Sequence, residues 1–181
     1  MKGQDIGTII RSGKAPRISY YAYEESSSQI IGNVVIEDNV FIGPGAIIRA
    51  DEPGSSIHIL KNSNVQDRAV LHAGKDDSIV IGPNTSLAHG SIVIGSVCIG
   101  TKCFIGFGSI VDNAEIQDEV FIKHLACIEN VTIRKECFVE SGKTVSTSSA
   151  AGTLPTVSEE QKAFAARVAR ENVRLADGYN R

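Results

Sequence analysis

Residues 81–110 read, in groups of six, IGPNTS LAHGSI VIGSVC IGTKCF IGFGSI, with an aliphatic residue opening every group. A period of six fits neither an α-helix, at 3.6 residues per turn, nor a half-buried strand, whose side chains alternate. It is typical of hexapeptide repeats, in which each hexad forms one flat side of a triangular coil and its aliphatic residue points to the axis. The sequence therefore predicts a mainly β protein, a left-handed parallel β-helix.

The repeat continues on both sides of this stretch. It begins at Ile30 and, after a slip to five residues at Val111, runs on to Val139. Two polar, turn-rich insertions interrupt it, at residues 51–56 and 72–77. A small residue four positions after the aliphatic one should fill each tight corner, as at Ala46, Thr85, Ser91, Ser109 and Ala126.

Four segments follow from this pattern. We expect an N-terminal lead-in and cap over 1–29, the β-helix over 30–147, a linker over 148–157, and a C-terminal helix and tail over 158–181. The linker is rich in Ser, Thr, Ala and Gly.

The C-terminal helix has a clear start signal. Ser158 and Gln161 have the spacing of a capping box, and the helix should end near Gly178. Its apolar stripe is Phe164, Val168 and Leu175. Asn172 lies on the same stripe, where a buried polar side chain needs a partner.

Composition excludes several classes of protein. The formal charge is −3 and basic residues are dispersed, which argues against binding nucleic acid or an acidic membrane. No run approaches the ~20 apolar residues of a membrane span, and no apolar segment follows Met1 as in a secretory signal. The four cysteines lack zinc-finger spacing and are interpreted as reduced structural thiols. We expect a cytoplasmic protein with no membrane or nucleic-acid partner.

Polar side chains concentrate between residues 49 and 89. The second and third positions of a hexad project outward, so His72, after Leu71, and His89, two after Leu87, should lie on the outside of the prism. Each would be unremarkable alone. Their concentration with carboxylates and amides indicates a site.

At this point the sequence resembles a known family. The segments RADE at 49–52, NVQD at 64–67, VLH at 70–72 and SLAH at 86–89 are similar to those of the γ-class carbonic anhydrases. The tail NVRLADGY at 172–179 is similar to the end of archaeal members and of the matching domain in carboxysome-organising proteins. The resemblance implies a parallel homotrimer with zinc or iron between protomers, held by three histidines. The metal-bound hydroxide of that family hydrates carbon dioxide to bicarbonate reversibly.

The metal ligands carry over incompletely. His72 matches the first ligand, and His89 matches the ligand that a neighbouring protomer donates. The third ligand position, five residues after His89, is Ile94, which cannot coordinate a metal. We therefore expect zinc or iron(II) to bind weakly or not at all. Lys75 replaces an archaeal glutamate that helps release protons, and lysine is a poor proton acceptor at neutral pH.

Other positions of the family site are kept. By resemblance, the catalytic positions are Glu52, Gln66 and Asn172. The resemblance places four further residues in the trimer interface or its supporting structure: Arg49, Asp51, Asn64 and Asp67. Of these, Arg49 and Asp67 match a pair that bridges protomers.

Substitutes for the missing histidine are few. We expect His58 one coil away and His124 two coils beyond His89, and Cys98 would need to reach the interface. Three functions therefore stay open. The chain is a carbonic anhydrase with an altered site acting on carbon dioxide and bicarbonate, a non-catalytic trimeric scaffold or binding module, or an acyltransferase of the wider hexapeptide superfamily.

Overall fold

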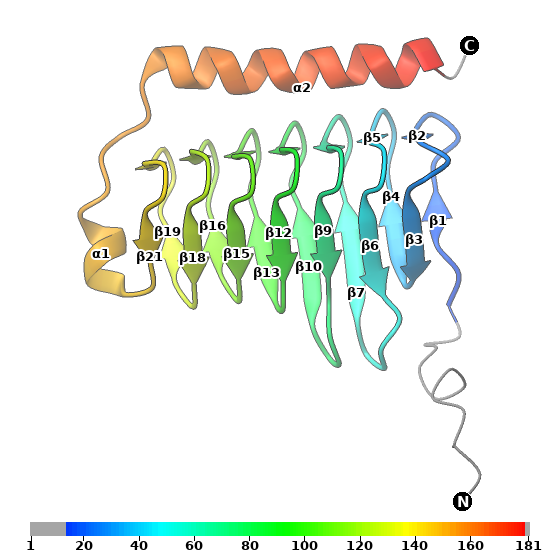
Figure 1. Cartoon of the computed structure of the whole chain (residues 1–181), viewed down its shortest axis with the longest axis horizontal. Coiled ribbons are helices and arrows are strands. Elements are labelled where there is room, and N and C mark those ends of the chain that lie inside the picture. Colours follow the sequence, from blue (N-terminus) through cyan, green and yellow to red (C-terminus); the bar gives the residue numbers. More distant parts are fainter. Residues whose placement is uncertain (1–13, 180–181) are drawn as a thin grey trace, which may run out of the picture.

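The computed structural model describes residues 14–179. The chain winds as a left-handed parallel β-helix, and a long helix lies along one side of it (Figure 1). The predicted fold class is thus confirmed. Residues 1–13 of the expected lead-in, including the start where a secretory signal was excluded, and residues 180–181 of the expected tail lie outside the described range.

The strands form three parallel sheets of seven strands each, the faces of a triangular prism. Face A consists of β1 (Arg17–Ile18), β4 (Val34–Ile36), β7 (Ser56–Ile59), β10 (Ser78–Ile81), β13 (Val97–Ile99), β16 (Glu115–Ile116) and β19 (Thr132–Ile133). Face B consists of β2 (Tyr23–Glu24), β5 (Phe41–Ile42), β8 (Asn64–Val65), β11 (Ser86–Leu87), β14 (Phe104–Ile105), β17 (Phe121–Ile122) and β20 (Phe138–Val139). Face C consists of β3 (Gln29–Gly32), β6 (Ile47–Ala50), β9 (Val70–His72), β12 (Ile92–Ile94), β15 (Ile110–Asp112), β18 (Cys127–Glu129) and β21 (Thr144–Val145).

The aliphatic positions of the hexads fill the axis. On face C, successive coils stack fully buried residues in register, namely Ile48, Leu71, Val93, Val111 and Ile128. The small corner residues Ala46, Thr85, Ser91, Ser109 and Ala126 are buried as well. Because every inward position is filled this way, each outward position is fixed too, and this sets the direction of the polar side chains.

Two regions have more structure than the hexads indicate. Residues 17–24, within the expected lead-in, form β1 and β2, which pair with β4 and β5. The short helix α1 (Ser148–Gly152), with Thr147 as its N-cap, occupies the start of the expected linker.

Helix α2 (Glu159–Tyr179) covers face B. The capping box is confirmed, because the Ser158 N–H donates to Gln161 Oε1 at 2.8 Å and the Gln161 N–H donates to Ser158 Oγ at 3.2 Å. Phe164 and Val168 pack against face B as expected. Leu175 does not, with 43% of its surface exposed. The helix buries small residues there instead, including Ala165, Ala169 and Ala176.

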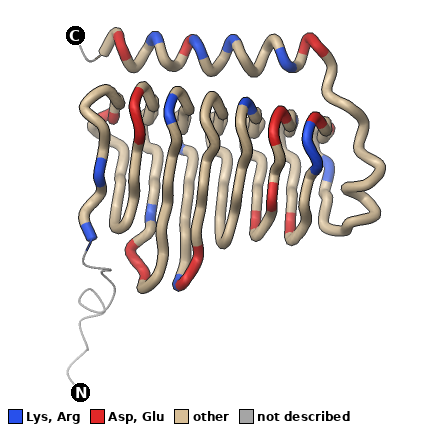
Figure 2. Tube along the Cα trace, turned by 180° about the vertical axis from the view of Figure 1, so that it is seen from behind, with Lys and Arg blue, Asp and Glu red and all other residues tan. Residues whose placement is uncertain are grey.

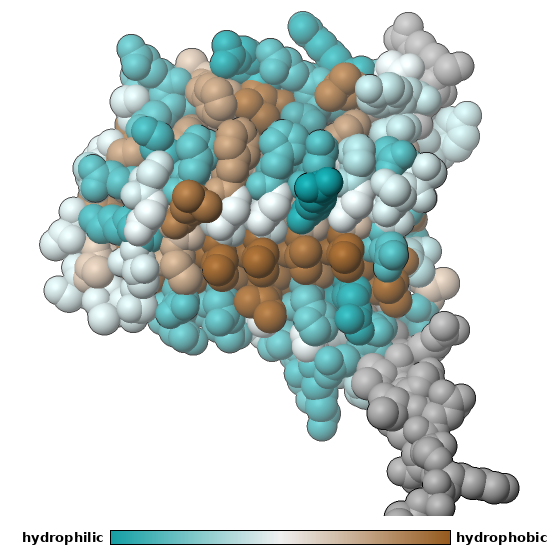
Figure 3. All heavy atoms as spheres, in the orientation of Figure 1, coloured by the Kyte–Doolittle hydropathy of each residue, from teal (hydrophilic) through white to brown (hydrophobic). Residues whose placement is uncertain are grey.

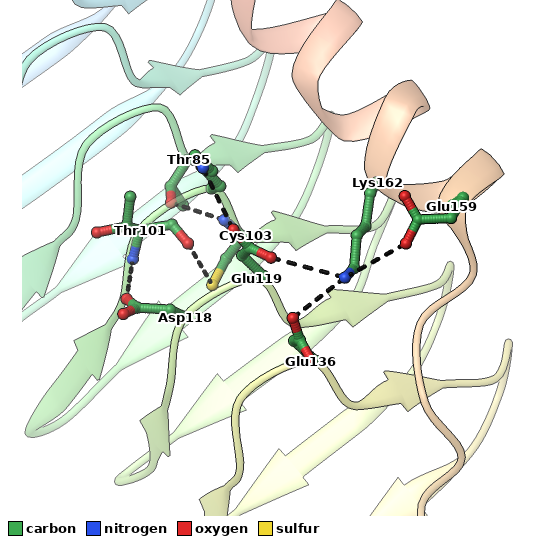
Figure 4. A network of polar contacts seen from close by, with 9 residues as sticks. Thr85, Thr101, Cys103, Asp118, Glu119, Glu136, Glu159 and Lys162 are labelled. Carbon is green, nitrogen blue, oxygen red and sulfur yellow. Dashed lines mark hydrogen bonds and ion pairs between the residues drawn. The ribbon is translucent and has the colours of Figure 1, made fainter.

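A charged cluster holds the start of α2 to the prism (Figure 4). Lys162 Nζ lies 3.1 Å from a Glu136 carboxylate oxygen, 3.5 Å from one of Glu159 and 3.8 Å from one of Glu119. The hydrogen bond to Glu136, more than the nearby negative charges, raises the pKa of Lys162 above its ordinary value. One lysine thus joins the helix to two successive coils.

Candidate metal centre

Face C carries the main polar column of the candidate site. Its outward side chains form a row, which we call the face C row, in which register partners on successive strands are Arg49, His72, Ile94, Asp112 and Glu129. Strand pairing sets these residues about 4.8 Å apart from coil to coil. The structure thus places Ile94 directly beside His72.

His72 has an unusual environment. Its Nε2 atom is buried, and no residue within 14–179 forms a hydrogen bond with it. The nearest carboxylate oxygen, Oε1 of Glu52, lies 3.9 Å away, beyond hydrogen-bonding range. Buried polar atoms almost always have a partner. The Nε2 atom of His72 is an exception to this rule within the described residues.

His89 lies elsewhere, on the corner between faces B and C. It follows β11, and its Nδ1 atom lies 3.6 Å from Asp67, one coil earlier. Its ring begins a column of rings along this corner, which we call the corner ridge: His89, Phe107 and His124, with centroid separations of 5.4 Å and 4.4 Å. The contact with Asp67 and the packing against Phe107 thus position the imidazole of His89.

One protomer does not assemble a metal centre. Over residues 14–179, no group of three His, Cys, Asp or Glu side chains could hold a metal ion. His72 offers an unpartnered nitrogen, which fits a metal ligand, whereas Ile94 offers only hydrocarbon. The residues present do not fit a site of three imidazoles.

None of the considered substitutes lies beside His72. His58 is on face A, where its Nε2 atom lies 2.9 Å from Glu37. Cys98 is also on face A. His124 stands two coils beyond His89 on the corner ridge, as β11, β14 and β17 are successive strands of face B.

Arg49 and Asp51 form a bidentate pair within the chain. Arg49 Nε and Nη2 donate to the two carboxylate oxygens of Asp51 at 3.2 and 3.1 Å. Burial alone would raise the pKa of Asp51, but the hydrogen bond and charge of Arg49 hold this pKa below its ordinary value. Within the chain, Asp67 lies 3.6 Å from His89. The Arg49–Asp67 bridge is expected between protomers and stays a prediction.

The amide residues of the site are buried. Asn64 Nδ2 donates to Ser86 Oγ at 2.8 Å, and Gln66 Nε2 donates to Asn64 Oδ1 at 3.0 Å. Asn64 thus fixes the orientation of Gln66. Asn172, on α2, donates from Nδ2 to the Val168 carbonyl at 2.9 Å. That bond satisfies part of the amide within its own helix.

The two insertions lie together beside this site. The Asp76 N–H donates to the Pro53 carbonyl at 2.9 Å, which joins the loop after β9 to the loop after β6. In Figure 2 both long loops contain acidic residues, and one of them also contains a basic residue. Lys75 is exposed in the second loop.

A groove of about 750 Å³ lies away from the candidate site. It runs along face A beside α1, and its lining includes Cys98, Glu115 and Arg134. It contains none of the predicted site residues. The hexad pattern gave no signal for it, because it depends on where α1 packs after the last coil.

Comparison with known proteins identifies relatives along most of the chain. It is 33% identical to a carbonic anhydrase of Methanosarcina thermophila, over 91% of this chain and 75% of that protein. It is 35% identical to the carboxysome assembly protein CcmM of Nostoc sp., over 93% of this chain. The chain spans only about a third of the length of that CcmM protein.

Solved structures share the fold at lower identity. A hexapeptide transferase family protein from Anaplasma phagocytophilum matches with a TM-score of 0.77 at 22% identity, over 91% of this chain and 92% of that one. A Bacillus cereus protein named as an acetyltransferase matches with a TM-score of 0.82 at 22% identity, over 94% and 96%. No family model matches the chain. Among the described helices, none is long and apolar enough to cross a membrane.

Proposed function

Because this chain belongs to the γ-class carbonic anhydrase family, we propose that it is a homotrimeric member whose metal site between protomers is degenerate. The observation that carries this proposal is the pairing of Ile94 with His72 on face C. The position beside His72 would have to supply a third nitrogen ligand, and it holds a branched hydrocarbon instead. Each ligand contributes substantially to metal affinity, so two imidazoles hold a divalent ion far more weakly than three.

Exposed apolar surface supports the trimer. In Figure 3 a band of apolar side chains crosses face C, formed by the register partners Ile47, Val70, Ile92 and Ile110. The neighbouring corner exposes Phe107 by 44% and Leu125 by 71%. Exposed apolar patches of this kind mark interaction surfaces.

The two apolar surfaces differ from one another, and this bears on symmetry. A contact between unlike surfaces of identical chains closes a ring when the rotation permits. In the proposed trimer the corner ridge of each protomer packs on face C of the next. His89 of the partner subunit then lies opposite His72, whose buried Nε2 atom has no partner among the described residues.

The proposed role of this trimer is that of a scaffold or binding module. An isoleucine cannot bind a metal, but it can pack in an interface between protomers. In the single chain 38% of the Ile94 surface is exposed. CcmM is named for assembly, which is consistent with such a role, although this chain matches only part of that protein.

Residual carbon dioxide hydration is a second candidate. It is favoured by the unpartnered Nε2 atom of His72, with Glu52 3.9 Å away, and by the Asn64 contact that orients Gln66. The likeness to acyltransferase-type structures extends to the fold alone, at 22% identity.

Elemental analysis combined with sedimentation tests the proposal. The protein is purified without chelator or affinity metal, its mass in solution is compared with the 19.3 kDa protomer, and zinc, iron and cobalt are measured per protomer. A trimer with far less than one metal per protomer is expected. A trimer with about one metal per protomer would refute the degenerate site and call for a hydration assay, whereas a monomer at micromolar concentration would refute the trimer.

A further inference from the structure

The face C row and the corner ridge share the same coil spacing. From Ile94 on β12, two steps along face C lead through Asp112 to Glu129 on β18. From His89 beside β11, two steps along face B lead through Phe107 to His124 beside β17. Parallel protomers keep equal heights along the axis. If His89 of the partner subunit lies opposite His72 and Ile94, the same arrangement places the partner's His124 two coils further on. At that height it lies opposite Asp112 and Glu129.

Asp112 and Glu129 lack a counter-charge in the single chain. They are direct register partners on adjacent strands, where like charges destabilise a sheet. Their neutral contacts are Asn113 Nδ2 to Asp112 Oδ1 at 2.9 Å and Cys127 Sγ to Glu129 Oε1 at 3.2 Å. No Lys, Arg or His within the described residues forms an ion pair with either carboxylate.

His124 has the complementary chemistry. The Phe107 N–H donates to its Nδ1 atom at 3.1 Å, and the two rings stack at 4.4 Å with an interplanar angle of 9°. Burial, and then the charge of Lys123, lower the pKa of His124. A nitrogen that accepts a hydrogen bond carries no proton, so the ring is neutral in the single chain. Because Nδ1 accepts a hydrogen bond, the proton of the neutral ring is assigned to Nε2, where no described residue accepts it.

We propose that the partner's His124 donates a hydrogen bond from Nε2 to the carboxylate pair Asp112 and Glu129, and so forms a polar latch between copies of this chain. The latch rests on the trimer proposed above and names a contact within it. Metal binding at Nε2 of His124 would require the proton to move to Nδ1, which would break the hydrogen bond from the Phe107 N–H. The latch holds the protomers in register two coils away from the degenerate metal position.

Subunit exchange tests the latch. Two populations of the full-length trimer carry different fluorophores, and energy transfer reports how fast they mix. His124→Phe keeps the stacking on Phe107 and removes the donor, so exchange should become about tenfold faster, because truncating one partner of a charged hydrogen bond acts mainly on dissociation. His124→Gln keeps an N–H donor and should retain part of the wild-type rate. His58→Phe, which removes a face A histidine paired with Glu37, is the matched control and should have no effect.

A double-mutant cycle ties the effect to the acidic pair. The variant with Asp112→Asn and Glu129→Gln should also exchange about tenfold faster, and adding His124→Phe to it should change the rate little further. Additive effects, an unchanged rate in His124→Phe trimers, or an equal effect of His58→Phe would overturn the latch while the trimer stands. A monomeric wild-type protein would overturn the trimer itself, and the latch with it.

Discussion

His72 and Ile94 are register partners on adjacent strands of face C, and only His72 can bind a metal. The imidazole presents a buried nitrogen that forms no hydrogen bond within residues 14–179. The isoleucine beside it presents methyl groups. Restoring a nitrogen at position 94 should therefore be the most direct way to recover metal binding.

Ile94→His should raise the metal content of the trimer from far below one to about one per protomer, because a third imidazole completes the ligand set. Elemental analysis after dialysis against zinc measures this. Ile92→His is the matched control, since it adds an imidazole to the same strand but in the apolar column beside Val70. An Ile94→His trimer that takes up no more metal than the Ile92→His trimer would show that position 94 is not the missing ligand.

Gly82→Ala should destabilise the fold by on the order of 2 kcal/mol or more. A Cβ atom at this position would lie 2.5 Å from the backbone of Gly100 in the next coil, where no side chain can rotate away. Chemical denaturation measures the free energy of unfolding. Gly152→Ala is the control, because a Cβ there meets no atom within 4 Å, and it should leave stability nearly unchanged.

Lys162→Met should loosen the start of α2. Lys162 neutralises Glu119, Glu136 and Glu159, and removing it leaves three carboxylates close together. Hydrogen exchange of the first two turns of α2 should become faster, whereas Lys102→Met, which affects only the bond to Glu119, should leave it close to wild type. Equal exchange in both variants would contradict a special role for Lys162.

The same lysine gives a pH dependence. Its pKa in the folded protein is raised, so its stabilising contribution is fully present below the ordinary lysine value of 10.5 and is lost as pH rises through the folded value. In the wild type, hydrogen exchange of α2 corrected for intrinsic rates should therefore speed up only above about pH 10.5. In Lys162→Met this alkaline step should be absent.

Cys103 should resist alkylation in the folded protein. Burial raises the pKa of its thiol to about 12, and the thiolate is the reactive form. Peptide mapping after treatment with iodoacetamide at pH 8 should find Cys98, which is exposed, modified well before Cys103. In urea the two should react alike. Rapid labelling of Cys103 without urea would mean that this corner of the prism opens.

Periodicity accounts for how much could be predicted. Once the aliphatic residue of each hexad faces the axis, the directions of His72 and Ile94 follow without knowledge of any contact. The five-residue spacing at Val111 did not change these inward and outward directions, since Val111 on β15 still pairs with Ile128 on β18. The capping box was equally local and equally predictable.

Side-chain partners were harder to predict. Arg49 bonds Asp51 within the chain, and the Arg49–Asp67 bridge expected between protomers stays a prediction. The apolar stripe of α2 predicted that Leu175 would be buried, but it is exposed. The helix packs on face B through small residues such as Ala165 and Ala169. The sequence of the helix alone does not determine which of its residues face the prism.

The sequence by itself determined the coil and its core, because a period of six residues is a local property that each hexad repeats independently. The missing ligand at position 94 followed from the resemblance to the γ-class carbonic anhydrases and not from the period. Only the tertiary structure decided that His72 keeps an unpartnered nitrogen, that Lys162 gathers glutamates from α2 and two successive coils, and that His124 stands at the height of Asp112 and Glu129. These relationships depend on which residues of different coils face one another. Loop lengths, helix docking and side-chain conformations set that together, and no single stretch of sequence contains them.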